Sequence, residues 1–125
     1  MRKQYHFWPG ARRLDAWDVD RLIALSADLP VEEVSLTEIW ELDTAYWGES
    51  MTPRQLAEHV QLTADVDTSY PIILGVDGRV MDGMHRVVRA LIEGRNTIRA
   101  VRFEVHPEPD YVDCAPDELP YPDTD

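Results

Sequence analysis

The segment VMDGMHRVVRA, residues 80–90, decides the fold because the spacing of its apolar side chains changes partway through. The residues before Asp82 are apolar and typical of a short buried strand. From Met84 onward, apolar side chains recur at positions 84, 87, 88, 91 and 92, which is the spacing of one face of an α-helix. The sequence therefore predicts a strand, a turn at Asp82-Gly83, and a helix that begins near Met84 and ends at Gly94.

The same strand is predicted to be the second half of a β-hairpin. Residues 71–75 are apolar and rich in β-branched side chains, and Asp77-Gly78 follows them as a strong turn signal. The second strand then covers residues 79–81. Strand, glycine turn and helix follow one another directly, so the first turn of the helix is expected to lie at the end of a sheet strand.

The start of this helix has the features of an anion-binding site. Asp82 is placed to cap the helix, and Gly83 permits a sharp turn and the close approach of a ligand. Free backbone N–H groups, the positive end of the helix dipole and guanidinium groups converge there, and phosphate is the expected anion. The predicted phosphate-binding residues are Gly83, Met84, His85, Arg86 and Arg89. The alternative is a structural role for each: a cap, a packed histidine and arginines paired with nearby acids.

Residues 77–94, DGRVMDGMHRVVRALIEG, resemble the core of the ParB/sulfiredoxin superfamily. Its members carry a strand, then a motif such as Asp-Gly-His-His-Arg, Gly-Gly-Cys-His-Arg or Gly-Glu-Arg-Arg, and then a helix that ends at glycine. The resemblance extends more loosely over residues 31–103. The form Asp82-Gly83-x-His85-Arg86 is nearest to that of the ParB-like free-serine kinases, with Met84 in place of a histidine.

The resemblance implies a nucleotide-binding domain whose turn and helix start hold phosphates. The nucleotide is CTP in ParB proteins, ATP in sulfiredoxins, and ADP or ATP in the free-serine kinases. We therefore expect ATP, ADP or CTP, with or without Mg²⁺, and the implied reactions are phosphoryl transfer to a small hydroxyl substrate or nucleotide hydrolysis. By position, Glu41 is the expected base, Asp43 is its rival, and Asp82 is the cap or a magnesium contact. Solvated acids on an acidic surface are the plain alternative for Glu41 and Asp43.

Departures from the superfamily pattern narrow the expected chemistry. Met84 stands where sulfiredoxins carry their reactive cysteine, and the single cysteine, Cys114, lies far along the chain, so sulfiredoxin chemistry is not expected. His85 replaces the first of the two consecutive arginines of ParB proteins. The DNA-binding helical region that follows in ParB proteins is not expected here either.

Net charge is −12, from 24 acidic and 12 basic side chains among 125 residues. Such a surface repels nucleic acid and anionic lipid, whose binding depends on Lys and Arg, so a DNA-binding or nuclease module is disfavoured. The charge is uneven, because residues 79–102 hold six arginines and two acids, which would favour a small phosphorylated ligand there. A single cysteine forbids an internal disulfide. With no apolar run of membrane-spanning length and no leader-like start, we expect a cytoplasmic protein that does not enter membranes.

The other segments predict two more helices and two more strands. Helices are expected from Asp15, as cap, to residue 26, and from Thr52, as N-cap, with Pro53 in its first turn. The buried face of the second helix is predicted to hold Leu56, Ala57, Val60, Thr63 and Ala64, with His59 half-buried beside it. Strands are expected over residues 31–36 and 97–105. The aromatic loop of residues 45–50 is either a substrate lid or a packing element.

We therefore expect a small single-domain α+β fold of the ParB/sulfiredoxin type over residues 1–105, with a mixed sheet and about three helices. Residues 1–14 form an arm that docks Phe7 and Trp8 on the core. Residues 106–125 form an acidic, proline-rich tail, extended and docked through Tyr111, Val112, Leu119 and Tyr121. The competing hypothesis is a non-catalytic acidic interaction protein, such as an inhibitor, antitoxin or immunity-like partner, that keeps the fold without the chemistry.

Overall fold

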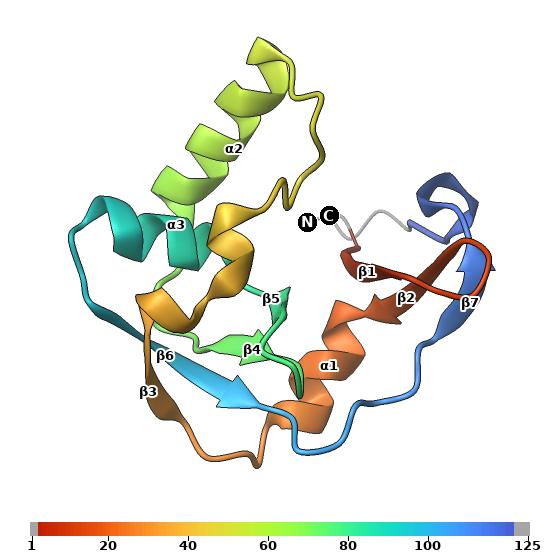
Figure 1. Ribbon diagram of the computed structural model, residues 1–125, viewed down its shortest axis with the longest axis horizontal. Helices are drawn as coiled ribbons and strands as arrows, with labels where there is room; N and C mark the ends of the chain where they lie inside the picture. The colour runs from red at the N-terminus through yellow and green to blue at the C-terminus, as the bar shows by residue number, and fades with distance from the viewer. Residues whose placement is uncertain (1–2, 122–125) are drawn as a thin grey trace.

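The computed structural model describes residues 3–121 and shows two β-sheets with three α-helices (Figure 1). The strands are β1 Tyr5–Pro9, β2 Leu14–Asp18, β3 Glu32–Ser35, β4 Ile72–Leu74, β5 Val80–Asp82, β6 Thr97–Arg102 and β7 Tyr111–Cys114. The helices are α1 Val19–Ser26, α2 Pro53–Asp65 and α3 Met84–Ile92, with short 3-10 turns η1 Leu36–Glu38, η2 Trp40–Asp43 and η3 Pro116–Glu118. The predicted α+β class with a mixed sheet and three helices is confirmed.

The predicted four strands form one mixed sheet, in the order β3-β6-β4-β5. β4 and β5 are the predicted antiparallel hairpin, β6 runs parallel to β4, and β3 runs antiparallel to β6. The connection from β5 to β6 passes through α3, which packs its apolar face on the sheet. The core between them contains Ile72, Leu74, Val80, Met84, Val87 and Ala100.

The turn from β5 into α3 depends on Gly83, which has a φ of 106°. A positive φ of this size is accessible to glycine and strained for other residues. Gly83 is itself the N-cap residue, and no side chain in the described part of the chain caps the helix, so the expectation that Asp82 caps α3 is wrong. Asp82 still belongs to β5, and its carboxylate instead accepts a hydrogen bond from Arg86 Nη2 at 2.8 Å. The predicted helix end is confirmed, since Gly94 follows α3 with a φ of 74°.

The amino-terminal segment forms a sheet that the sequence did not predict. β1 and β2 are an antiparallel hairpin, in which Asp15 pairs with Trp8 and does not cap a helix. The helix begins only at Val19, where Asp18 is the cap and accepts a hydrogen bond from the Asp20 N–H. Residues 14–18 adopt a strand because both neighbouring strands, β1 and β7, supply hydrogen-bond partners to β2. These long-range partners outweigh the local helical pattern.

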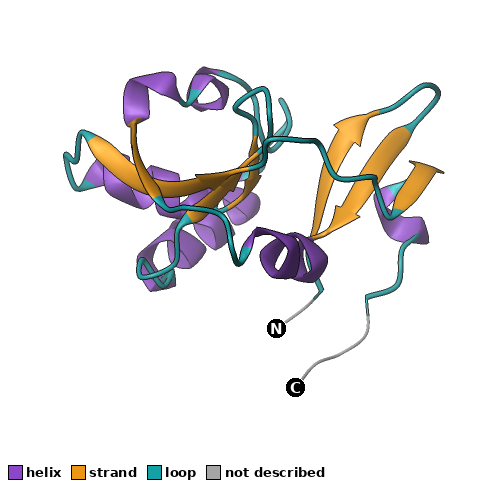
Figure 2. Ribbon diagram, turned by 90° about the horizontal axis from the view of Figure 1, so that it is seen from below, coloured by secondary structure: helices purple, strands orange, loops and turns teal. Residues whose placement is uncertain are grey.

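The carboxyl-terminal segment completes this second sheet through β7, which pairs antiparallel with β2. Cys114 and Leu119 are buried there against Ala16, so the segment joins the amino-terminal strands in one small core. Of the residues predicted to dock, Leu119 is 7% exposed and Val112 is 65% exposed. Residues 122–125 of the predicted tail lie outside the described part of the chain. The two sheets stand beside one another, with α1 at their junction (Figure 2).

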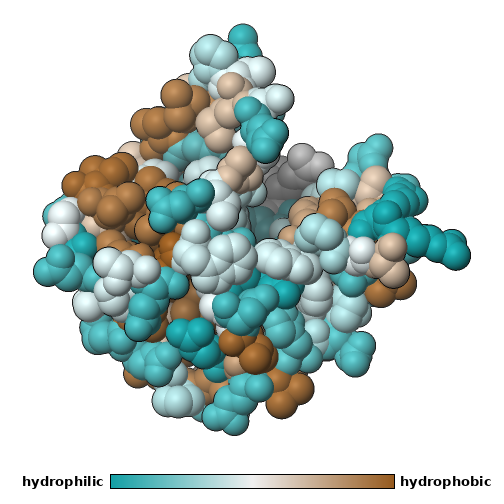
Figure 3. Space-filling model, in the orientation of Figure 1, coloured by the Kyte–Doolittle hydropathy of each residue, from teal (hydrophilic) through white to brown (hydrophobic). Residues whose placement is uncertain are grey.

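α2 begins as predicted, because Thr52 and Gln55 form a reciprocal capping box and Pro53 occupies the first turn. Its predicted buried face is wrong, however: Leu56 is 55% and Val60 is 60% exposed, and only Thr63 is buried. The helix projects from the body of the protein and contacts it mainly through α3 (Figure 1). Apolar side chains gather on the surface over α2 and α3 (Figure 3). Among residues 3–121, the helices are all too short or too polar to cross a membrane.

The turn at Gly83 can be tested by substitution. A Cβ at this position would lie 2.7 Å from both Ile72 Cγ2 and Arg86 Nη2. We expect Gly83→Ala to lower the free energy of unfolding by about 3 kcal/mol, the sum of backbone strain and a core clash. Gly94→Ala is the matched control, because it has a positive φ and nothing within 4 Å of the added Cβ. It should cost about 1 kcal/mol. Urea unfolding measures both, and equal losses would contradict the steric role of residue 83.

Candidate functional site

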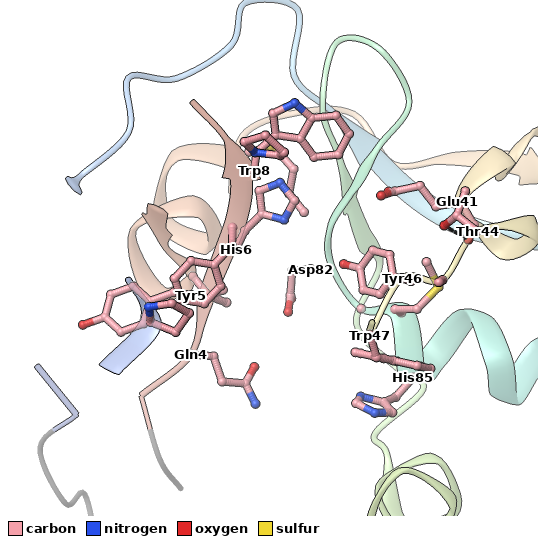
Figure 4. Close-up of a pocket in the computed structure, with 18 of the residues that line it drawn as sticks. Gln4, Tyr5, His6, Trp8, Glu41, Thr44, Tyr46, Trp47, Asp82 and His85 are labelled. Atoms are coloured by element: carbon pink, nitrogen blue, oxygen red, sulfur yellow. Dashed lines mark hydrogen bonds between the residues drawn. The ribbon is translucent and has the colours of Figure 1, made fainter. Parts of the chain in front are cut away.

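A cleft of about 1040 Å³ lies between the two sheets and receives the start of α3. One wall is β1, and the other consists of η2, the loop that follows it, and the turn from β5 to α3 (Figure 4). Aromatic rings from both walls line the cleft: Tyr5, Phe7, Trp8, Trp40, Tyr46, Trp47 and Tyr121. A concave, mostly aromatic cavity of this size with a few polar groups is typical of a small-molecule site.

The amino terminus of α3 opens into the cleft through Gly83, Met84 and His85. The first hydrogen bonds of the helix are donated by the N–H groups of Arg86 and Val87, both to the Gly83 carbonyl. The N–H groups of Met84 and His85 therefore have no partner within the helix, and no side chain of residues 3–121 caps it. Met84 and His85 both line the cavity, so two uncapped backbone donors and the positive end of the helix dipole lie at its wall, which is the arrangement expected for an anion site.

The side chain of His85 is held in place by a three-ring stack. Trp47 stacks on His59 at 4.1 Å and on His85 at 4.8 Å between ring centroids, and His59 Nδ1 lies 2.8 Å from His85 Nε2. Burial lowers the pKa of His85, and the neighbouring His59 lowers it further, which keeps the imidazole neutral. The aromatic loop thus packs over the helix start through Trp47, and His59 ties α2 to that loop.

Arg86 is close to the site but stands behind Asp82. The Asp82 carboxylate lies between the two walls of the cleft (Figure 4), and Arg86 Nη2 is 2.8 Å from it. Arg86 Nε is buried and has no hydrogen-bond partner among residues 3–121. The guanidinium also borders a separate cavity of about 260 Å³ on the far side, beside Arg95 and Arg99. Arg86 therefore neutralises Asp82 and does not line the cleft itself.

Arg89 is not part of the cleft. Its Nη1 donates to the Ala64 carbonyl at 2.8 Å, and its Nε lies 3.3 Å from Glu93 Oε2. The first of these bonds fastens the last turn of α2 to α3, and the second lies within the end of α3. The sequence spacing placed Arg89 one turn above the predicted site, but the carbonyl groups at the end of α2 attract the guanidinium instead.

Glu41 lies in the cleft wall and is the better placed of the two predicted acids. It is 5% exposed, and its Oε1 accepts a hydrogen bond from the Val80 N–H. Burial raises the pKa of Glu41, although the Val80 N–H opposes this shift. Asp43 is exposed on η2 and does not border the cleft. Glu41 and Asp82 thus both line the cavity, with Tyr46 between them.

The β1 wall contains a buried histidine that sequence reasoning missed. His6 is 6% exposed, and its Nε2 has no hydrogen-bond partner among the described residues. Burial and the positive charge of Arg79 lower the pKa of His6 to about 4. Arg79 stays in place because it pairs with Asp77 at 2.9 Å and lies 3.6 Å from the centre of the Trp8 ring. The interleaved basic and aromatic residues near the amino terminus were the signal, but they do not reveal the pairing of β1 with β2.

Carboxylates outnumber free cations in the cleft, and this excess of negative charge limits which ligands the cleft can bind. The lining includes Glu41, Asp82 and Asp117, whereas the amine of Lys3 is occupied by Asp18 and Asp20 at 2.8 Å each. No group of three or more metal-binding side chains occurs among residues 3–121. Mg²⁺ commonly binds through one or two carboxylates together with ligand phosphates and water, so these residues fit a metal that arrives with a phosphorylated ligand.

The neutral state of His6 predicts a pH dependence of stability. Its pKa is about 4 in the folded protein and about 6.5 when exposed, so between these values the unfolded chain takes up a proton that the folded protein does not. The free energy of unfolding must fall as pH drops through this window, by up to about 1.4 kcal/mol per pH unit. Between pH 6.5 and pH 5, we expect the free energy of unfolding to fall by about 1.5 kcal/mol less in His6→Phe than in the wild type, as measured by urea unfolding. Parallel losses in the two proteins would contradict this assignment.

Comparison of the chain with protein-family models, with curated proteins and with solved structures gives no match. The resemblance to the ParB/sulfiredoxin superfamily therefore stays a prediction that rests on residues 77–94.

Proposed function

We propose that this protein binds a nucleotide, ATP, ADP or CTP, with its phosphates at the start of α3. The observation that carries the proposal is the uncapped helix terminus, whose Met84 and His85 N–H groups open into a large aromatic cleft. The sequence motif at residues 82–86 supports the same ligand independently of the cleft. The ring-lined walls suit a heteroaromatic base, and the helix terminus suits an anion.

The acids in the cleft make a magnesium complex the fitting form of the ligand. A free nucleoside triphosphate would meet the Asp82 and Glu41 carboxylates, which repel it. Mg²⁺ offsets this repulsion because it binds phosphate oxygens and carboxylates together. Asp82 stands beside the helix terminus and is the residue that would contact the ion. Arg86, paired with Asp82, then sets how strongly that carboxylate attracts the metal.

The chemistry that fits these groups is transfer of a phosphoryl group to a hydroxyl or to water. Glu41 would accept the proton of the attacking hydroxyl or water, while the attacking oxygen forms a bond to the terminal phosphorus. The bond from that phosphorus to the bridging oxygen breaks, and the nucleotide leaves with one phosphate fewer. Burial raises the pKa of Glu41, which strengthens the carboxylate as a proton acceptor. Glu41→Gln should then abolish turnover and retain nucleotide binding, which separates the base from the binding site.

A pair of substitutions at His85 tests the backbone donor. Proline is tolerated in the first turn of a helix and has no N–H for the phosphate to use. It also restricts the backbone of the preceding residue, Met84, so the helix content of both variants is compared by circular dichroism. His85→Ala is the matched control, because both variants lose the imidazole. In calorimetric titrations with Mg-ATP, Mg-ADP and Mg-CTP, we expect His85→Pro to bind about 2 kcal/mol more weakly than His85→Ala, the scale of a charge-assisted hydrogen bond. Equal affinities would refute phosphate binding at this terminus.

Removal of the Arg86 guanidinium tests the role of the Arg86–Asp82 pair beside the helix start. Arg86→Ala removes the hydrogen bond that holds the Asp82 carboxylate in position for the proposed metal contact. We therefore expect binding of the magnesium–nucleotide complex to weaken by about 2 kcal/mol, the scale of a charge-assisted hydrogen bond. Arg95→Ala is the control, since Arg95 borders the far cavity and its side chain is 65% exposed. Calorimetry at matched magnesium concentration measures both. An Arg86→Ala protein that binds nucleotide as well as the wild type would defeat the assignment.

A second candidate function is a non-catalytic protein-interaction module. The observation that favours it is the exposed apolar surface over α2 and α3, where Leu56, Val60 and Ile92 are 55%, 60% and 72% exposed. Apolar side chains gathered on one surface often mark a protein contact. Absence of binding to every nucleotide, with and without magnesium, would favour this candidate over the first.

A further inference from the structure

One face of β1 supplies the cleft with a row of polar and aromatic side chains. Alternate residues of a strand point to opposite faces. Gln4, which directly precedes β1, lies on the same face as His6 and Trp8, and all three line the cleft (Figure 4). Tyr5 and Phe7, on the other face, pack on the small core of the second sheet and border the cleft as well. An amide, an imidazole and an indole thus follow one another along a single wall, opposite the start of α3.

His6 is the member of this row with an unmet hydrogen-bonding capacity. Its ring contacts Trp8 at 6.2 Å and Trp17 at 5.5 Å between centroids, and the side chain is more than nine-tenths buried. Nε2 nevertheless has no partner among residues 3–121. A buried polar atom without a partner is unfavourable and rare in folded proteins. His6 lines a ligand-sized cleft, and a molecule bound there can supply the missing partner once it displaces the side chains that cover Nε2.

Burial, together with Arg79 and His106, keeps His6 a neutral hydrogen-bonding group, while Asp77 acts in the opposite direction. Arg79, Asp77 and His106 are the ionisable groups that act on it, and Arg79 has the largest effect after burial. A neutral imidazole offers one N–H donor and one acceptor nitrogen. The Gln4 side chain, on the same face, adds an amide with a donor and an acceptor. This combination matches the polar edge of a nitrogen heterocycle, which also carries donors and acceptors side by side.

We propose that the Gln4, His6 and Trp8 face of β1 is the base-binding wall of the cleft, and that it recognises the nitrogen heterocycle of the bound nucleotide. The inference rests on the proposed function for the position of the phosphates. It adds that specificity resides in the amino-terminal sheet, outside the segment that resembles the superfamily. His6 and Gln4 contact the polar edge of the base, and Trp8, with Trp40 at 6.3 Å, provides the aromatic surface.

The test compares a nucleotide with its phosphate chain alone. Calorimetry measures the affinity of the full-length protein for Mg-ATP, Mg-CTP and Mg-tripolyphosphate, and for adenosine and cytidine. His6→Phe retains a ring of similar size and removes both nitrogens. His106→Phe is the matched control, because His106 Nε2 is also buried without a hydrogen-bond partner but the residue does not line the cleft. Gln4→Ala, at an exposed position, is a second variant that leaves the core untouched.

The wild type should bind at least one nucleotide about tenfold more tightly than tripolyphosphate, the scale of one good hydrogen bond to a base. His6→Phe should remove most of that advantage, Gln4→Ala part of it, and His106→Phe none, while tripolyphosphate affinity stays unchanged. The base-binding wall would be overturned if the wild type bound nucleotides and tripolyphosphate with equal affinity. It would also be overturned if both His6→Phe and Gln4→Ala bound nucleotides as tightly as the wild type. Nucleoside binding that requires His6, without any binding of tripolyphosphate, would support the wall and overturn the phosphate site. No binding of any of these ligands would overturn both.

Discussion

The structure depends on the left-handed backbone turn at Gly83. This residue ends a buried strand and starts a helix with a φ of 106°, and its bare Cα fits against Ile72 and Arg86. The turn directs the amino terminus of α3 away from the sheet core and into the space between the two sheets. Because glycine has no side chain to cap the helix, the first N–H groups remain open to that space. One backbone conformation thus fixes both the packing of α3 and the chemistry of the cleft.

The central hairpin and α3 could be predicted because their signals are local. The apolar period changes at Asp82-Gly83, and glycines mark both ends of the helix, so neighbouring residues contain enough information. The second sheet could not be predicted in this way. β2 pairs with β7, so that Leu14 lies opposite Cys114, and no short pattern reports a contact across so long a stretch of chain. The same long-range pairing converted the predicted first turn of α1 into a strand.

The candidate site was predicted in part, and its charges were the weakest element of the prediction. Counting arginines between residues 79 and 102 suggested a basic pocket. In the structure, Asp77 pairs with Arg79, Asp82 pairs with Arg86, and the end of α2 binds Arg89. The sequence shows which charges are present but not which are already neutralised. The burial of Glu41 and of His6 likewise depends on the approach of distant segments, so their shifted pKa values could not be anticipated from their neighbours in the chain.

The central claim is that the uncapped N–H groups at the start of α3 bind phosphate. The most direct measurement is a ¹H–¹⁵N NMR titration of the labelled protein with Mg-ATP and with Mg-tripolyphosphate. Our account predicts that the amide signals of Met84 and His85 shift with both ligands and approach saturation, because both ligands present the same phosphate chain to the helix. Amide shifts confined to other segments, or none at either residue at saturating ligand, would contradict it.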